Sequence, residues 1–142
     1  MQFLPYDPGR LPTKKTPSKG DKLYIKVTGL PPFKDEHFSI RNQKHPNYDD
    51  FKRLRDEAIK AMNGMAWYFG PVHLDFVLYS PDTPKKSLVV YVGGIMDTLD
   101  GSSGPQFTYL PIVFEDDCQV VSSKSAFQKS VDTWYALEIS FL

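Results

Sequence analysis

Cysteine is nearly absent from this sequence, because Cys118 is the only one in 142 residues. A single thiol excludes an internal disulfide bond and a cysteine-based zinc site, and it favours a reducing compartment. The sequence also lacks any run close to the roughly 18 apolar residues that a membrane helix needs. Residues 1–6 lack the basic start and apolar core of a signal peptide. These absences predict a cytoplasmic protein that does not bind a membrane.

The common catalytic motifs are also missing. No glycine-rich phosphate loop is present, since the Gly101–Gly104 stretch lacks the lysine that completes such a loop. There is no nucleophile-elbow motif, and Cys118 has acidic neighbours that raise the pKa of a thiol and disfavour a nucleophile. No two histidines have the spacing of metal ligands on one helix face; the three are His37, His45 and His73.

The overall composition is that of one globular domain. Hydrophobic residues make up 41% of the chain and charged residues 24%, and the length allows one domain with a core rather than two. The net charge of zero hides a split, because residues 1–70 carry 13 Lys and Arg against 8 Asp and Glu, whereas residues 71–142 carry 4 against 9. The split fits a basic surface for an anionic partner, and it equally fits charges on a solvated tail.

The N-terminal half contains an irregular arm, a strand and a helix. Residues 1–21 are rich in proline, glycine and lysine, which predicts a flexible or surface-wrapping arm. In residues 22–30 apolar and polar side chains alternate, as in a half-exposed strand. An amphipathic helix is expected from Asn47, which can cap its start, to Gly64, which ends it.

Three further strands are expected in the C-terminal half. Residues 72–79 alternate between apolar and other side chains and are closed by a turn rich in proline. Residues 119–123 and 133–141 have the composition of two more strands. We expect a loop or short turn between them, around residues 126–128.

The stretch 84–101 is ambiguous between helix and strand. Its valines and the pair Gly93-Gly94 disfavour a helix, so the helix is expected to be shortened or replaced by a strand through Val92. Four apolar residues nevertheless share one helical face: Leu88, Val92, Ile95 and Leu99. With a helix here, the sequence predicts a single α+β (mixed α/β) domain over residues 22–142, in the order β-α-β-α-β-β with a mixed sheet.

Carboxylates are the remaining candidates for chemistry. Asp116 and Asp117 lie just before a predicted strand, and carboxylate oxygens are the ligands that Mg²⁺ prefers. Because adjacent residues cannot both point the same way from a strand, a metal at Asp117 needs further ligands from elsewhere. We expect them near residues 84–92, which offer only Lys85, Lys86 and Ser87 as polar groups after the turn.

The order of these segments resembles the RusA-type Holliday-junction resolvases, small endonucleases of phages and prophages. The similar pieces are a strand followed by a double proline (27–32), a strand ending in Pro-Asp (71–82), the basic turn Lys85-Lys86, a helix end of the Asp-Ala-Leu type (96–99) and an Asp-Asp-x-Gln-Val segment (116–120). The resemblance covers residues 22–142. It implies a mixed fold that binds branched DNA as a homodimer and cleaves it with Mg²⁺.

The resemblance also implies that the active site is degenerate. In the register of the family, Ser87 and Val89 occupy the two metal-binding aspartate positions, Val90 replaces an asparagine and Gly93 replaces a lysine. Asp117 alone matches the third metal-binding aspartate, and it is therefore the expected remnant of the catalytic site. Asp82 and Asp97 are possible substitutes, although Asp97 lies about 15 Å along a helix from Ser87.

These features predict a non-catalytic RusA-like binding module for branched or duplex DNA, with Lys34, Lys85 and Lys86 as DNA contacts. No cofactor is expected, and Mg²⁺ enters only if nuclease activity survives at Asp116 and Asp117. One alternative is a protein-interaction factor of a phage or mobile element. The other is a Mg²⁺-dependent Holliday-junction endonuclease with a displaced set of ligands.

Overall fold

The computed structural model describes residues 15–33, 48–100 and 111–142 and contains the predicted order of elements. Strand β1 covers Lys22–Thr28 and strand β2 covers Val72–Ser80, with helix α1, Tyr48–Met62, between them. Helix α2, Leu88–Leu99, is followed by a 3-10 turn, η2, at Asp117–Gln119. The last two elements are β3, Val120–Lys129, and β4, Trp134–Phe141. The predicted α+β fold and its element order are confirmed.

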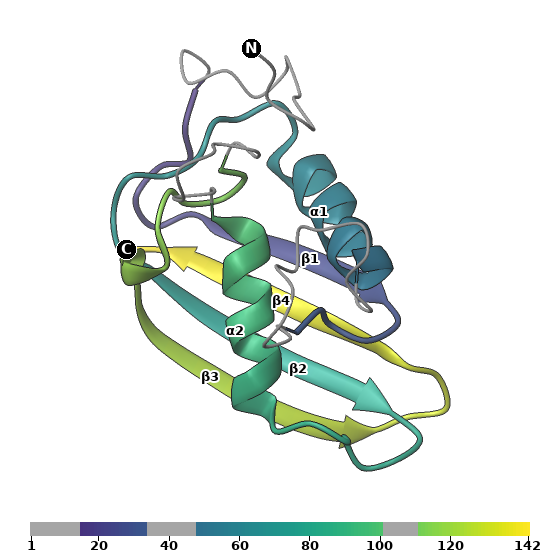
Figure 1. Cartoon of the computed structure of the whole chain (residues 1–142). Coiled ribbons are helices and arrows are strands. Elements are labelled where there is room, and N and C mark those ends of the chain that lie inside the picture. The colour runs from purple at the N-terminus through teal and green to yellow at the C-terminus, as the bar shows by residue number, and fades with distance from the viewer. Residues whose placement is uncertain (1–14, 34–47, 101–110) are drawn as a thin grey trace.

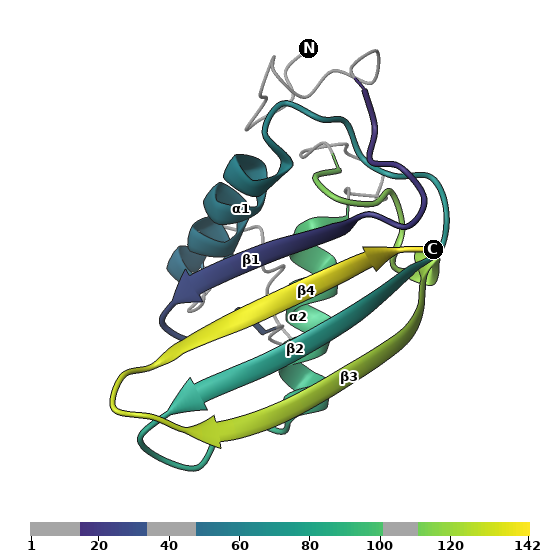
Figure 2. The same ribbon diagram turned by 180° about the vertical axis from the view of Figure 1, so that it is seen from behind.

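The strands form one mixed sheet in the order β1-β4-β2-β3 (Figure 2). Strand β4 pairs antiparallel with both β1 and β2, whereas β3 pairs parallel with β2. The parallel pair requires a crossover connection, and α2 lies in that connection. Chain order therefore places α2 next to the β2–β3 half of the sheet.

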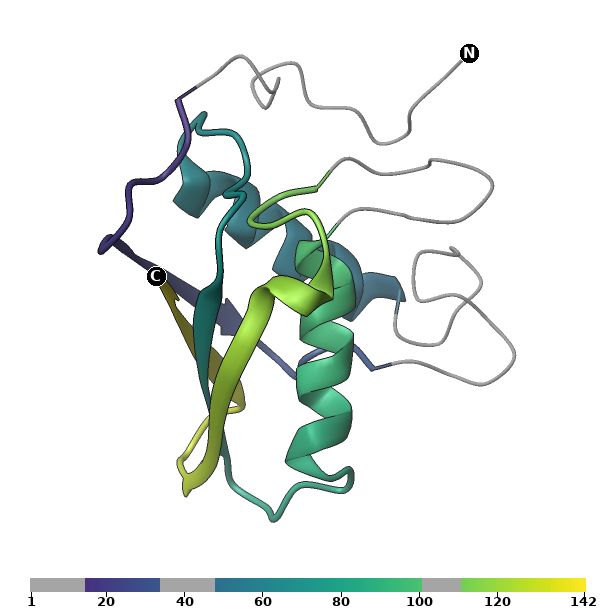
Figure 3. The ribbon, with the colours of Figure 1, turned by 90° about the vertical axis from the view of Figure 1, so that its left-hand side faces the viewer.

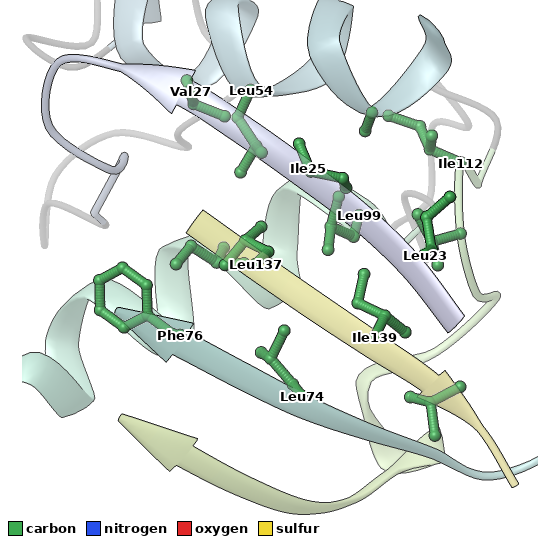
Figure 4. Close-up of a cluster of buried hydrophobic side chains, with 14 of the residues drawn as sticks. Leu23, Ile25, Val27, Leu54, Leu74, Phe76, Leu99, Ile112, Leu137 and Ile139 are labelled. Carbon is green, nitrogen blue, oxygen red and sulfur yellow. The ribbon is translucent and has the colours of Figure 1, made fainter. Parts of the chain in front are cut away.

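Both helices cover the same face of the sheet (Figures 1 and 3). Figure 4 shows the core between the layers, where Leu54 of α1 and Leu99 of α2 meet apolar residues of the sheet such as Ile25 and Leu137. All four side chains are at most 2% exposed. Burying a side chain of this size contributes about 1.5–3 kcal/mol, so this two-layer core is the main support for the elements that carry the candidate site.

The ambiguous stretch is a helix, and its start and packing explain why. The Ser87 hydroxyl accepts a hydrogen bond from the backbone N–H of Val90 (3.4 Å), which caps the first turn. Gly94 faces the backbone of residues 32–33, and a Cβ there would overlap the Pro32 carbonyl. Gly93 faces open space. One of the two helix-weakening glycines is therefore required by close packing, and the strand alternative was wrong.

The loop expected around residues 126–128 is absent, because β3 continues through them to Lys129. Nine pairs of residues join β3 to β2, from Val72–Val120 to Ser80–Lys129. The polar side chains of β3 are mostly exposed because it is an edge strand. In a strand that is exposed on both faces, apolar and polar side chains do not alternate. The second half of β3 therefore lacked the pattern from which strands were predicted.

Residues 15–21, the described part of the predicted arm, contain no helix or strand. The Gly20 N–H donates to the carbonyl of Phe141 at the end of β4 (2.6 Å), and the N–H of Ala66, between α1 and β2, donates to the Lys15 carbonyl (3.0 Å). Within the described part of the chain, no helix has both the length and the apolar character to cross a membrane.

Candidate functional site

The N-terminal end of α2 carries two exposed lysines and no acidic residue. Lys85, Lys86 and the capping residue Ser87 are all exposed, and the first turn of the helix contains no carboxylate. The Lys86 ammonium lies 4.9 Å from the centroid of the Phe33 ring, a cation–π contact. Helix N-termini attract anions through their unpaired N–H groups and the helix dipole, so this end of α2 is electrostatically suited to a phosphate.

The other positions that the resemblance to the resolvases singles out, Val89, Val90 and Gly93, lie on the first two turns of α2 and offer no metal ligand. Val89 is 77% exposed and Val90 is 41% exposed, and a side chain at Gly93 would meet open space. A valine offers no donor atom, and the Ser87 hydroxyl is engaged in capping the helix. The residues at the positions that the resemblance assigns to metal ligands therefore do not fit Mg²⁺.

The other end of α2 carries a group of carboxylates. Asp97, Asp100 and Asp117 each place one carboxylate oxygen within 4.8 Å of the others. Asp97 and Asp100 are partly buried, whereas Asp117 is exposed. Asp97 and Asp100 are three residues apart and so share a helical face. This spacing is the feature of the sequence from which their proximity could have been predicted. From the sequence, Asp97 is a possible substitute ligand, disfavoured by its distance from Ser87, and Asp100 is not among the candidates.

Backbone contacts bring Asp117 to this end of the helix. The N–H groups of Ile112 and Val113 both donate to the Leu99 carbonyl at 3.1 Å. Gln119 then fixes the acidic turn, because its amide nitrogen donates to the carbonyls of Tyr68 and Gly70, both at 2.8 Å. Its amide oxygen also accepts from the backbone N–H groups of Glu115 and Asp116.

Asp117 and Ser87 consequently lie at opposite ends of one helix. Ten residues separate Ser87 from Asp97, which is about 15 Å along a helix, and Asp117 lies with Asp97. The acidic neighbours of Asp117 are therefore Asp97 and Asp100, whereas the sequence led us to expect partners near residues 84–92. Asp82, the other possible substitute, is exposed in the turn that follows β2.

Asp116 has a structural role in η2. Its side chain accepts a hydrogen bond from the Cys118 N–H (3.1 Å), and with Gln119 it forms a capping box. That hydrogen bond is the main reason why the pKa of Asp116 is lowered. Loss of hydration, followed by the negative charge of Asp116, raises the pKa of the Cys118 thiol, in the direction that the sequence predicted.

The donor chemistry of the three grouped carboxylates fits a hard cation such as Mg²⁺, which binds carboxylate oxygens and water. Asp117, which the sequence predicted as a site residue, therefore has two acidic neighbours among the described residues. Asp116 is not a member, and its engaged carboxylate caps η2. Lys34, the third predicted DNA contact, lies outside the described residues.

No protein-family model matches the chain, and no curated protein matches it.

Proposed function

We propose that this chain is a RusA-like DNA-binding module that does not cleave DNA. The observation that supports the proposal is that the positions singled out by the resemblance lie at opposite ends of α2. The end with the resolvase-register positions has Ser87 as a cap and an exposed valine at position 89. Asp117, the one matching aspartate, lies at the other end. A phosphodiesterase of this family would need these positions to act on one metal.

DNA contact is assigned to the lysine end of α2. Lys85 and Lys86 are exposed next to the helix N-terminus, where the helix dipole and the ammonium groups all attract phosphate. Such contacts are independent of base sequence and weaken with salt. A homodimer would present two of these ends to the arms of a branched junction, and a cytoplasmic location is consistent with this role.

The test is a gel-shift titration of the full chain with a labelled four-way junction, without metal, across salt concentrations. Wild-type protein should bind, and Lys85→Ala/Lys86→Ala should lower the slope of log affinity against log salt by about 1 to 2, because each lysine neutralises up to one phosphate. Lys52→Ala/Lys60→Ala on α1 is the matched control, since these exposed lysines have acidic partners within the helix. No shift at micromolar protein, or equal effects of both double variants, would contradict the proposal.

An endonuclease with displaced ligands is the second candidate. It is favoured by the approach of Asp97 and Asp100 to Asp117. Magnesium-dependent junction cleavage that is abolished by Asp117→Asn, and unaffected by Asp116→Asn, would support this candidate and overturn the non-catalytic one. A protein-interaction factor is the remaining alternative, and it predicts a shift with neither junction nor duplex DNA.

A further inference from the structure

The face of the sheet that points away from α1 and α2 carries a hollow of about 450 Å³. Figure 2 looks onto this face, with the strands in front and the helices behind. The floor consists of small side chains, because Val77 lies opposite Ala136 of β4 and opposite Ala126 of β3. A volume of this size is within the usual range of ligand-binding clefts.

One wall of the hollow is acidic. Asp75 of β2 lies directly opposite Glu138 of β4, and both line the hollow. Like charges in directly opposite positions of neighbouring strands repel each other. Glu138 is balanced by Lys22, whose Nζ lies 3.3 Å away on a side chain that is 61% exposed. His73 Nε2 lies 3.1 Å from Asp75 Oδ1 and balances its charge only when the ring is protonated.

Aromatic side chains border the hollow. Tyr79 stacks on Trp134 with the ring centroids 3.9 Å apart and the planes 6° apart, and the Lys26 ammonium lies 4.5 Å from the centroid of the same indole. These contacts hold the Tyr79 ring, which lines the hollow, in one orientation. Tyr24 also lines it and is 70% exposed. The pKa of the Tyr24 hydroxyl is raised, first by its hydrogen bond to Glu138 and then by the negative charge of that carboxylate, with a smaller effect from Asp75.

We infer that this hollow binds an arginine side chain of a partner protein. A planar guanidinium can lie against an aromatic ring while its forked N–H groups reach two carboxylates. Asp75 and Glu138 provide such a pair, and Tyr79 provides a held ring. A lysine ammonium has no plane to stack and a less suitable donor geometry. A nucleic-acid strand would bring phosphates towards both carboxylates, which disfavours it here.

The site is independent of the proposed DNA contact. It lies on the uncovered face of the sheet, whereas Lys85 and Lys86 lie at the start of α2, on the covered side (Figure 3). Lys124 lines the β3 end of the hollow beside Asp75. The guanidinium is therefore expected nearer to Glu138, where it competes with the loosely held Lys22.

The experiment is an NMR titration of the full ¹⁵N-labelled chain with the peptide acetyl-Gly-Gly-Arg-Gly-Gly-amide. Saturable shifts are expected for the backbone amides of the floor residues Val77, Ala126 and Ala136. The same peptide with citrulline in place of arginine keeps the shape and loses the charge, and it should give no saturable shift. The lysine peptide should bind several-fold more weakly. Equal binding of the citrulline peptide, or no saturation with the arginine peptide at millimolar concentration, would overturn the inference.

Charge-removing variants test the acidic wall. Asp75→Asn/Glu138→Gln should weaken arginine-peptide binding at least tenfold, and Glu138→Gln alone should weaken it severalfold without disturbing the His73–Asp75 contact. Asp56→Asn/Glu57→Gln on the exposed side of α1 removes the same number of charges and should leave binding unchanged. If Asp75→Asn/Glu138→Gln and Glu138→Gln both bind the arginine peptide as tightly as the wild type, with unchanged melting curves, this site is excluded. Shifts of the same amides by oligo(dT), abolished by Tyr79→Ala, would assign the hollow to nucleotides and also overturn the inference.

Discussion

Asp117 lies beside Asp97 at the C-terminal end of α2, with a carboxylate oxygen of each within 4.8 Å of the other. Ser87, which the proposed resemblance aligns with a metal-binding aspartate, caps the opposite end of that helix. The contact between Asp117 and the last turn of α2 follows from the parallel β2–β3 pair. The crossover helix runs back along the sheet, so β3 begins where the helix ends.

Aspartates introduced at the two positions that the proposed resemblance assigns to metal ligands should not create a nuclease. In Ser87→Asp/Val89→Asp the new carboxylates would lie about 12–15 Å along the helix from Asp97, the neighbour of Asp117, too far for one ion or a pair of ions to bridge within the chain. The measurement is cleavage of a labelled four-way junction with Mg²⁺, with Ser87→Asn/Val89→Asn as the uncharged control. Cleavage by the aspartate variant alone would show that the two ends of α2 act on one phosphate.

The two adjacent glycines of α2 should respond oppositely to alanine. Gly93→Ala places a methyl group in open space on the helix and should raise the free energy of unfolding by about 0.5–1 kcal/mol, because alanine is the better helix former. Gly94→Ala would overlap the backbone of Pro32 and Phe33 and should lower it by about 2 kcal/mol or more. Urea unfolding of both variants measures the difference. Equal effects would mean that residues 32–33 do not pack on α2 in this way.

The sequence contained enough information for the elements with a buried face. Alternation in β1, β2 and β4 and the spacing of apolar residues in α1 predicted these elements to within a few residues, because each has one side in the core. The second half of β3 was missed because its exposed side chains carry no such pattern. Packing decided α2, where Gly94 is explained only by the approach of Pro32.

The candidate site was less predictable than the fold. Asp117 was identified from a motif, but its neighbours depend on the way residues 111–117 return to the end of α2. The hollow on the open face was not predicted either. Alternation shows that Asp75, Glu138 and Tyr79 point away from the core, whereas their pairing depends on the register of three strands.

A buried tyrosine hydroxyl gives a further stability prediction. Tyr135 is fully buried, its Oη has no hydrogen-bond partner among the described residues, and burial raises the pKa of its hydroxyl well above the ordinary value. Tyr135→Phe keeps the ring contact with Phe76 and should increase stability by about 1 kcal/mol, since an unpaired buried hydroxyl costs free energy. Tyr68→Phe is the control, because it removes a 2.7 Å hydrogen bond to the Leu142 carbonyl and should decrease stability. A loss of stability in Tyr135→Phe would reveal a partner for its hydroxyl.

The acidic wall of the hollow should show an altered titration. The Tyr24 hydroxyl donates to Glu138, and this hydrogen bond is the main reason why the pKa of Glu138 is lowered. Its contribution to stability is therefore fully present above the unfolded pKa of about 4.3 and is lost as the pH falls through the folded value. NMR titration should find the Glu138 pKa below the ordinary glutamate range in the wild type and raised in Tyr24→Phe. Tyr79→Phe should leave it unchanged, and an unchanged value in Tyr24→Phe would rule out this hydrogen bond.

The central claim, DNA binding without cleavage, is tested most directly by one assay on a four-way junction. Wild-type protein is incubated with the labelled junction with and without Mg²⁺, and binding and cleavage are measured on the same samples. The account predicts a salt-sensitive complex that weakens in Lys85→Ala/Lys86→Ala, with the junction strands intact at every metal concentration. Strand cleavage that requires Mg²⁺ and disappears in Asp117→Asn would contradict it, as would the absence of any complex at micromolar protein.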